Sequence, residues 1–226
     1  MQPAPLLKTP SVLAESFLTE ALIDRKHELA ELRRALLPLV NRRTPRNVWV
    51  HGPPGCGKTS VVKFVLNESE DRHGILGVYV NCWETATWHS VLDRITRDLR
   101  ILSADRLNSV YKMERLEHAI RGKALVVVLD EIDRPVPRDR DAIIYNLCSM
   151  PNVALMCICN SRYYYQLLDE RVKSRLAAML LEFNPYPTQA IRAILDQRAA
   201  LSLMVDAAQP EVLRRIVALP TATLGW

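Results

Sequence analysis

The sequence predicts an α/β domain in which a parallel five-stranded sheet is flanked by helices and followed by a partial helical lid. Short apolar runs alternate with helical patterns between residues 48 and 183, as in parallel sheets, where each crossover between strands carries a helix. Most of these runs are nearly continuous, which is typical of strands covered on both faces. After Pro187 the pattern is helical only, and this change predicts the lid.

Composition and charge limit the class of protein. The 226 residues are 24% charged and 49% apolar, the balance of one large globular domain with at most a small appendage. No apolar run approaches the ~18 residues of a membrane-spanning helix, and no signal pattern opens the chain, so we expect a cytoplasmic protein without a membrane partner. The net charge of +5 is compatible with nucleic acid, although a solvated basic surface is the commoner explanation.

The first forty residues predict a leader arm and one helix. Residues 1–16 are rich in proline and weakly patterned, so we expect them to form a leader arm. From Ile23 to Val40 apolar residues recur at helical spacing, and a basic turn ends this helix before Asn47. The expected apolar face consists of Leu29, Leu32, Leu36, Leu37 and Val40.

Strands and helices then alternate through the main domain, 17–186. The lid, 187–226, begins at Pro187, after which no further strand is expected. The expected strands are 48–50, 76–81, 125–130, 153–160 and 179–183. The expected helices are 58–69, 87–101, 108–121 and 139–149 in the main domain, and 188–202 and 209–218 in the lid.

The turn after the first strand carries a phosphate-binding motif, Walker A. Gly52-Pro-Pro-Gly-Cys-Gly-Lys-Thr59 fits G-x-x-x-x-G-K-[ST] between an expected strand and an expected helix, the arrangement of a P-loop NTPase. Glycines let backbone N–H groups turn inward around a phosphate, and the following helix points its positive end there. Lys58 would supply charge to the β- and γ-phosphates of ATP, and Thr59 a hydroxyl to Mg²⁺. The residues expected to bind ATP here are Gly52, Pro53, Pro54, Gly55, Cys56, Gly57, Lys58, Thr59 and Ser60.

An acidic pair, the Walker B motif, follows the third apolar run. Leu125-Val-Val-Val-Leu leads directly into Asp130 and Glu131, which places both at the carboxyl edge of the sheet, where parallel sheets bind ligands. Asp130 is expected to hold Mg²⁺ through a water molecule. Glu131 is expected to act as the general base for the attacking water. A buried strand with an ordinary polar end is the alternative, and the upstream phosphate motif favours the catalytic interpretation.

Asn160 ends the next expected strand, 153–160. Its amide could orient the attacking water or contact the γ-phosphate. Asparagine also favours turns on its own account, so the position has an equally simple structural explanation. The spacing alone leaves both interpretations open.

Together these motifs resemble the ATPase core of the AAA+ replication initiators, in particular the archaeal origin-recognition/Cdc-type family. The resemblance covers about residues 17–200. A P-loop alone is shared by many ATPases, whereas the Arg-Val-Lys-Ser run followed by Pro-Tyr is far more specific to this family. The matching segments, in chain order, are Ala21–Leu29, Tyr79–Cys82, Val127–Asp133, Ile158–Asn160, Leu168–Arg175 and Phe183–Tyr186.

The resemblance implies further site residues. Ile23 would lie beside the adenine, and Asn160 would be the first sensor. Arg175, or alternatively Arg171, would be an arginine finger that reaches the ATP of a neighbouring subunit, so that an isolated subunit hydrolyses ATP slowly. Ion pairs with local acids are the alternative for both arginines.

The resemblance also implies partners and a location. It implies ATP and ADP, origin or other double-stranded DNA in the full-length protein, and AAA+ subunits in a homo- or hetero-oligomer, at the nucleoid. The family's second sensor and winged helix would come after residue 226. Four arginines stand where the family has its initiator-specific insertion, and either DNA phosphates or solvent could face them. They are Arg94, Arg97, Arg100 and Arg106.

Two other functions stay open at this point. One is an AAA+ ATPase of signalling or transposition that acts on a protein partner, against which the Arg-Val-Lys-Ser and Pro-Tyr run argues. The other is a nucleotide-dependent scaffold that binds ATP without hydrolysing it.

Overall fold

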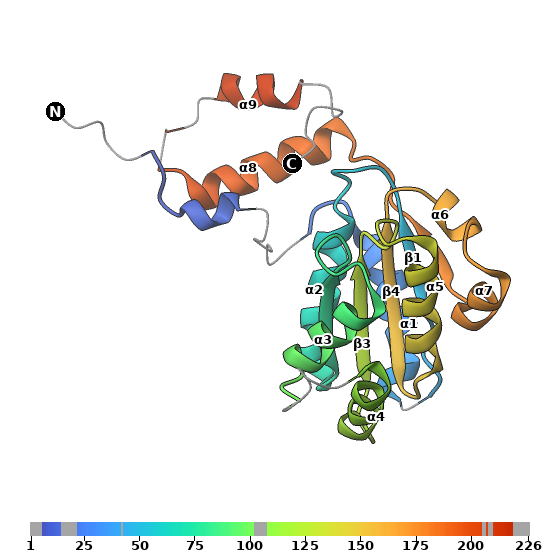
Figure 1. Cartoon of the computed structure of the whole chain (residues 1–226). Coiled ribbons are helices and arrows are strands. Elements are labelled where there is room, and N and C mark those ends of the chain that lie inside the picture. The colour runs from blue at the N-terminus through green and yellow to red at the C-terminus, as the bar shows by residue number, and fades with distance from the viewer. Residues whose placement is uncertain are drawn as a thin grey trace.

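Five parallel strands form one sheet in the order β2-β3-β4-β1-β5 (Figure 1). The computed structural model of the protein describes residues 6–14, 22–41, 43–101, 108–204, 207 and 210–218. The strands are β1 (Val48–His51), β2 (Leu76–Asn81), β3 (Leu125–Asp130), β4 (Val153–Cys159) and β5 (Met179–Glu182). This confirms the predicted α/β fold and places β1, which precedes the glycine-rich turn, between β4 and β5.

Helices cover both faces of the sheet. The described helices are η1 (Pro10–Leu13), α1 (Lys26–Val40), α2 (Lys58–His73), α3 (Trp88–Asp98), α4 (Ser109–Ala119), α5 (Pro137–Ser149), α6 (Tyr163–Gln166), α7 (Glu170–Leu176), α8 (Thr188–Ser202) and α9 (Pro210–Val217). Apolar residues of α1 and α2 form one core with one face of the sheet, and those of α3, α4, α5 and α7 form a second core with the other face.

The central strands show why their sequences are continuously apolar. Every residue of β3 and of β4 is buried, because successive side chains point into the two cores in turn. Val126 packs in the core of α1 and α2, whereas Val127 packs in the opposite core. Cys157 and Cys159 share the second core as free thiols.

Helix α1 differs from its sequence prediction at two points. It begins at Lys26, since Asp24 adopts a left-handed conformation with φ 55°, which a helix cannot include. The prediction that Leu37 lies on the apolar face is wrong: Leu37 is 53% exposed, and Leu39 is buried in its place. The buried positions 29, 32, 36 and 39 keep the spacing of one helical face, from which Leu37 is rotated by about 100°.

The parallel arrangement brings three polar strand ends to one edge. His51 ends β1, Asp130 ends β3, and Asn160 directly follows β4. All three therefore lie at the carboxyl edge, next to the turn 52–57 that joins β1 to α2.

The segment 6–14 lies against α8. The backbone N–H groups of Lys8 and Thr9 both donate to the carbonyl of Ser202, at 2.7 and 3.1 Å, and Leu7 forms an antiparallel bridge with Leu203. Figure 1 shows η1, α8 and α9 grouped beyond the carboxyl edge of the sheet. Within the described ranges, no helix is both long and apolar enough to cross a bilayer.

Asn47 fixes the start of β1 between its two neighbours. Its Nδ2 donates to the carbonyl of Leu176 at 2.7 Å, and its Oδ1 accepts from the N–H of Leu155 at 2.9 Å. Its own carbonyl accepts from the N–H of Met179 at 2.9 Å. One side chain thus joins β1 to β4 and to the end of α7.

We predict that Asn47→Ala lowers the free energy of unfolding by about 2–4 kcal/mol, because it leaves one N–H and one carbonyl without partners. Chemical denaturation measures the effect. Asn41→Ala is the matched control, since the Asn41 amide bonds only the exposed carbonyl of Leu37 in its own helix. Equal losses in the two variants would contradict the bridging role.

Candidate functional site

The turn 52–57 approaches the segment after β5 so closely that two of its glycines have no room for a side chain. A Cβ at Gly52 would collide with the carbonyl oxygen of Phe183. A Cβ at Gly57 would lie 2.5 Å from the hydroxyl of Tyr186, and Gly57 adopts φ 84°, in the left-handed region. The glycines therefore allow both the inward-turned backbone and its contact with residues 183–186.

Lys58 begins α2 and lies inside this turn. It is 7% exposed, and its Nζ donates to the carbonyls of Gly52 at 2.7 Å and Pro53 at 2.9 Å. The same amine donates to Oδ1 of Asn160 at 3.1 Å. The structure thus brings together the lysine and the asparagine that the sequence singled out separately.

Asp130 is held by three donors. The hydroxyl of Thr59 donates to its Oδ2 at 2.8 Å, and the hydroxyl of Tyr79 donates to the same oxygen at 2.7 Å. The N–H of Glu131 donates to Oδ1 at 2.9 Å. Thr59 and Asp130, the two expected Mg²⁺ ligands, are therefore in contact. Sequence analysis missed Tyr79, which reaches the carboxylate from the neighbouring strand β2.

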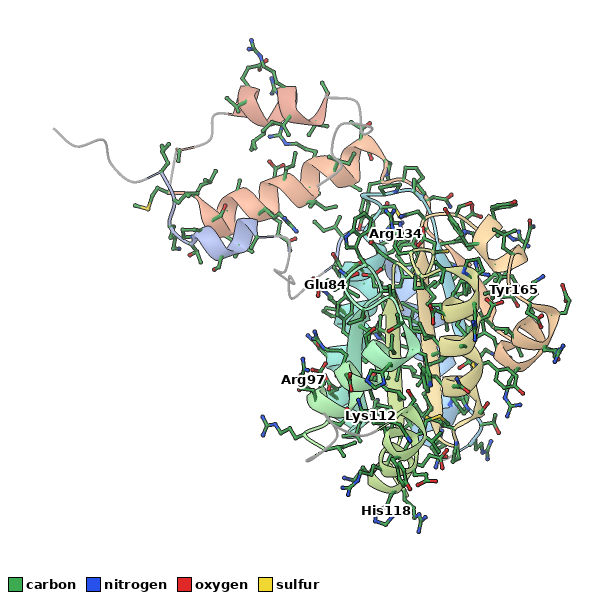
Figure 2. The ribbon with its side chains drawn as sticks, in the orientation of Figure 1. Glu84, Arg97, Lys112, His118, Arg134 and Tyr165 are labelled. Atoms are coloured by element: carbon green, nitrogen blue, oxygen red, sulfur yellow. The ribbon has the colours of Figure 1, made fainter. Side chains whose placement is uncertain are left out.

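Glu131 projects from an unusual backbone position. Its φ is 51°, a left-handed conformation that is uncommon outside glycine. Burial raises the pKa of its carboxyl above the ordinary value, and Arg134 opposes that rise, with its Nε 3.6 Å from Oε2. The Arg134 guanidinium stacks on the exposed ring of Trp83 at 4.1 Å. In Figure 2 Arg134 lies at the end of the sheet opposite to Lys112 and His118.

The remaining residues of the motif surround these groups. Pro53, Pro54 and Gly55 are exposed, and Ser60 lies half-buried in the first turn of α2. Cys56 is 2% exposed, and burial raises the pKa of its thiol. Ile23, which the resemblance places beside the adenine, lies in the turn before α1.

Arg171 and Arg175 lie on α7, in the helical layer opposite to α2. Arg175 stacks on the ring of Tyr145 at 4.9 Å and donates to its hydroxyl at 3.5 Å. The side chain of Arg171 is 90% exposed and lies 4.0 Å from Asp169. The structure therefore leaves both arginines on an outer surface, away from the turn 52–57 of the same chain.

The donor set fits a nucleoside triphosphate with a divalent cation. An ammonium group and the positive end of α2 suit phosphate oxygens. The hydroxyl of Thr59 and the carboxylate of Asp130 are oxygen ligands of the kind that Mg²⁺ prefers. Oδ1 of Asp133 is buried without a hydrogen-bond partner, and burial raises the pKa of that carboxyl. It adds a further acidic group near Glu131.

A family model described as an AAA domain matches residues 40–163, which include the turn, the acidic pair and Asn160. The chain belongs to the AAA domain family. Curated relatives agree with the resemblance found in the sequence: an ORC1-type DNA replication protein of Methanothermobacter thermautotrophicus is 31% identical over 97% of this AAA chain and 59% of its own length. One of Thermococcus kodakarensis is 32% identical over 86% of this chain and 51% of its own length. The chain thus spans little more than half of these relatives.

Solved structures of an ORC1 protein and of a Cdc6p protein share the fold. The Aeropyrum pernix ORC1 protein, in complex with DNA, superposes with a TM-score of 0.84 at 28% identity, over 96% of this chain and 60% of that one. Cdc6p from Pyrobaculum aerophilum superposes equally well, with a TM-score of 0.84 at 22% identity, over 94% of this chain and 59% of that one. The resemblance to the archaeal origin-recognition/Cdc-type family is confirmed.

We predict that Gly57→Ala lowers the free energy of unfolding by about 1–3 kcal/mol more than Gly74→Ala does. Both glycines have positive φ, 84° and 62°, but a Cβ at Gly74 meets open space, so the difference isolates the contact with Tyr186. Chemical denaturation measures both variants. Adding Tyr186→Phe to Gly57→Ala should recover part of the loss, and no recovery would contradict this account of the contact.

Proposed function

We propose that this chain is the ATP-binding and slowly hydrolysing core of a DNA replication initiator of the origin-recognition type. The proposal is supported by two hydrogen bonds at the carboxyl edge of an AAA domain, one between Lys58 and Asn160 and one between Thr59 and Asp130. Four polar groups from three elements converge there on one glycine-rich turn.

The residues have distinct roles in the proposed reaction. Lys58 and the N–H groups of the turn bind the β- and γ-phosphates, while Thr59 and Asp130 hold Mg²⁺, which supplies charge neutralisation when bound. Glu131 accepts the proton of the attacking water, and its raised pKa brings it closer to neutral pH, where a general base works best. Asn160 orients that water.

Arg175 is the proposed arginine finger. It is exposed and stacks on Tyr145, in the helical layer opposite to α2, and we propose that it reaches the site of a second subunit. Hydrolysis by an isolated subunit is therefore slow, and assembly of AAA subunits accelerates it, since such fingers contribute roughly 10³–10⁵ in rate.

Several further assignments belong to the same proposal. Residues 17–186 form the nucleotide-binding domain, and residues 187–226 the beginning of a lid, with 1–16 as an arm.

DNA is the proposed partner because an ORC1 protein of this fold was solved with DNA. Arg97 on α3 is exposed (Figure 2), and so is Arg100 in the turn after α3, whereas Arg94 is ion-paired with Asp98 at 2.8 Å. Arg106 lies outside the described residues. The proposed site of action is the nucleoid in the cytoplasm.

We predict that Lys58→Ala abolishes ATP binding, because it removes the charge inside the turn, and that Glu131→Gln keeps binding and stops turnover. Calorimetric titration with ATP and Mg²⁺ measures affinity, and phosphate release measures turnover. Normal ATP binding by Lys58→Ala would refute the site. Wild-type binding without any phosphate release, even at high protein concentration, would favour the non-hydrolysing scaffold.

We also predict that Arg175→Ala binds ATP with unchanged affinity but loses the turnover that rises with protein concentration. Mixing it with Glu131→Gln should restore part of that turnover. The Glu131→Gln subunit keeps Arg175, which can then act on the site of the Arg175→Ala subunit, where Glu131 is intact. Arg171→Ala, on the same helix, is the control and should behave as the wild type. Absence of any rescue on mixing would contradict action between subunits.

A further inference from the structure

Arg25 is a buried cation that directly contacts the phosphate-binding turn. It precedes α1 and is 3% exposed, outside the Walker A and Walker B motifs. Its Nη2 donates to the carbonyl of Cys56 at 2.9 Å and to the carbonyl of Asn184 at 2.7 Å. Its Nη1 donates to Glu28 at 2.7 Å. One nitrogen thus joins two segments that are more than a hundred residues apart.

The bond to Cys56 determines where the next amide points. In a trans peptide the carbonyl and the following N–H point in opposite directions, and no cis peptide occurs in the part of the chain that the structure describes. Because Arg25 holds the carbonyl of Cys56 on its own side, the N–H of Gly57 points away from Arg25. A cation on the carbonyl also polarises the peptide, which strengthens that N–H as a donor.

Aromatic rings hold the guanidinium in place. The ring of Tyr186 lies 3.9 Å from its central carbon and that of Phe183 lies 5.3 Å away. Tyr186 is also the residue against which Gly57 packs. The guanidinium therefore lies between the turn and the segment 183–186, which leads from β5 into α8.

The ion pair of Arg25 can be removed without removing the hydrogen bonds that position the Cys56 peptide. The ion pair with Glu28 uses Nη1, whereas both carbonyl bonds use Nη2. The buried Nε has no hydrogen-bond partner, so the hydrogen bonds of Nη1 and Nη2 hold the guanidinium. Loss of the ion pair alone would leave the orientation of the Cys56 peptide intact.

We propose that Arg25 is a positioning residue: it aims the N–H of Gly57 at the phosphate of a bound nucleotide and couples that amide to the segment 183–186 and thereby to α8. This inference rests on the proposed nucleotide site. One side chain, that of Arg25, then links phosphate binding to the helices that follow the sheet.

Affinity for ADP tests the positioning role. Arg25→Lys keeps the charge but cannot reproduce the planar fork, so it should bind ADP about tenfold more weakly, the factor of one charge-assisted hydrogen bond. Glu28→Gln is the matched control, because it removes the ion pair but not the carbonyl bonds, and should bind ADP within about twofold of the wild type. Equal ADP affinity of Arg25→Lys and the wild type, or an equal loss in Glu28→Gln, would overturn the inference while leaving the site intact.

Hydrogen exchange of the unaltered protein tests the coupling and does not depend on the folding of a variant. Addition of ADP should slow exchange at the amides of 57–59 and of 184–190 together. Protection of the turn without protection of 184–190 overturns the coupling. A wild-type protein that shows no response to ADP at either segment refutes the nucleotide site itself, and the inference with it.

Discussion

The contact between the glycine-rich turn and the segment after β5 is the constraint on which the rest of the site depends. Because β5 lies beside β1 in a parallel sheet, the residues that follow the two strands emerge at the same edge. Phe183 and Tyr186 therefore pack against Gly52 and Gly57, where any Cβ would intervene. The absence of side chains at these glycines is therefore needed for this packing as well as for binding a ligand. The shape of the turn is consequently tied to a region far along the chain.

Strand order also explains how the polar groups meet. β4 lies beside β1, so Asn160 reaches the amine of Lys58 directly. β3 lies one strand further, and Asp130 is met by Thr59 from the first turn of α2. The buried faces of β3 and β4 hold these strand ends rigidly, since every residue in both strands is enclosed between two helical layers. A packed core thus positions side chains that lie at its rim.

Much of this could be predicted from the sequence, because it depends on local patterns. Continuous apolar runs predict the strands, and the motifs that contain Lys58, Thr59 and Asp130 predict a phosphate and metal site. The predictions that fail, and the contacts that are missed, depend on tertiary packing, which local patterns do not determine. The side of α1 that faces the sheet depends on one rotation of the helix, and Leu37 and Leu39 are equally apolar. Tyr79 and Arg25 reach the site only through strand order and loop packing, and neither stands in the Walker A or Walker B motif.

The proposed role of Arg25 is to fix the peptide between Cys56 and Gly57 so that its N–H binds a phosphate. The decisive experiment is a crystal structure of the chain with ADP and Mg²⁺. We expect the N–H of Gly57 to donate to a β-phosphate oxygen while the carbonyl of Cys56 remains on Arg25. A phosphate bound elsewhere, or a Cys56 carbonyl turned away from Arg25 while the phosphate is bound, would contradict it.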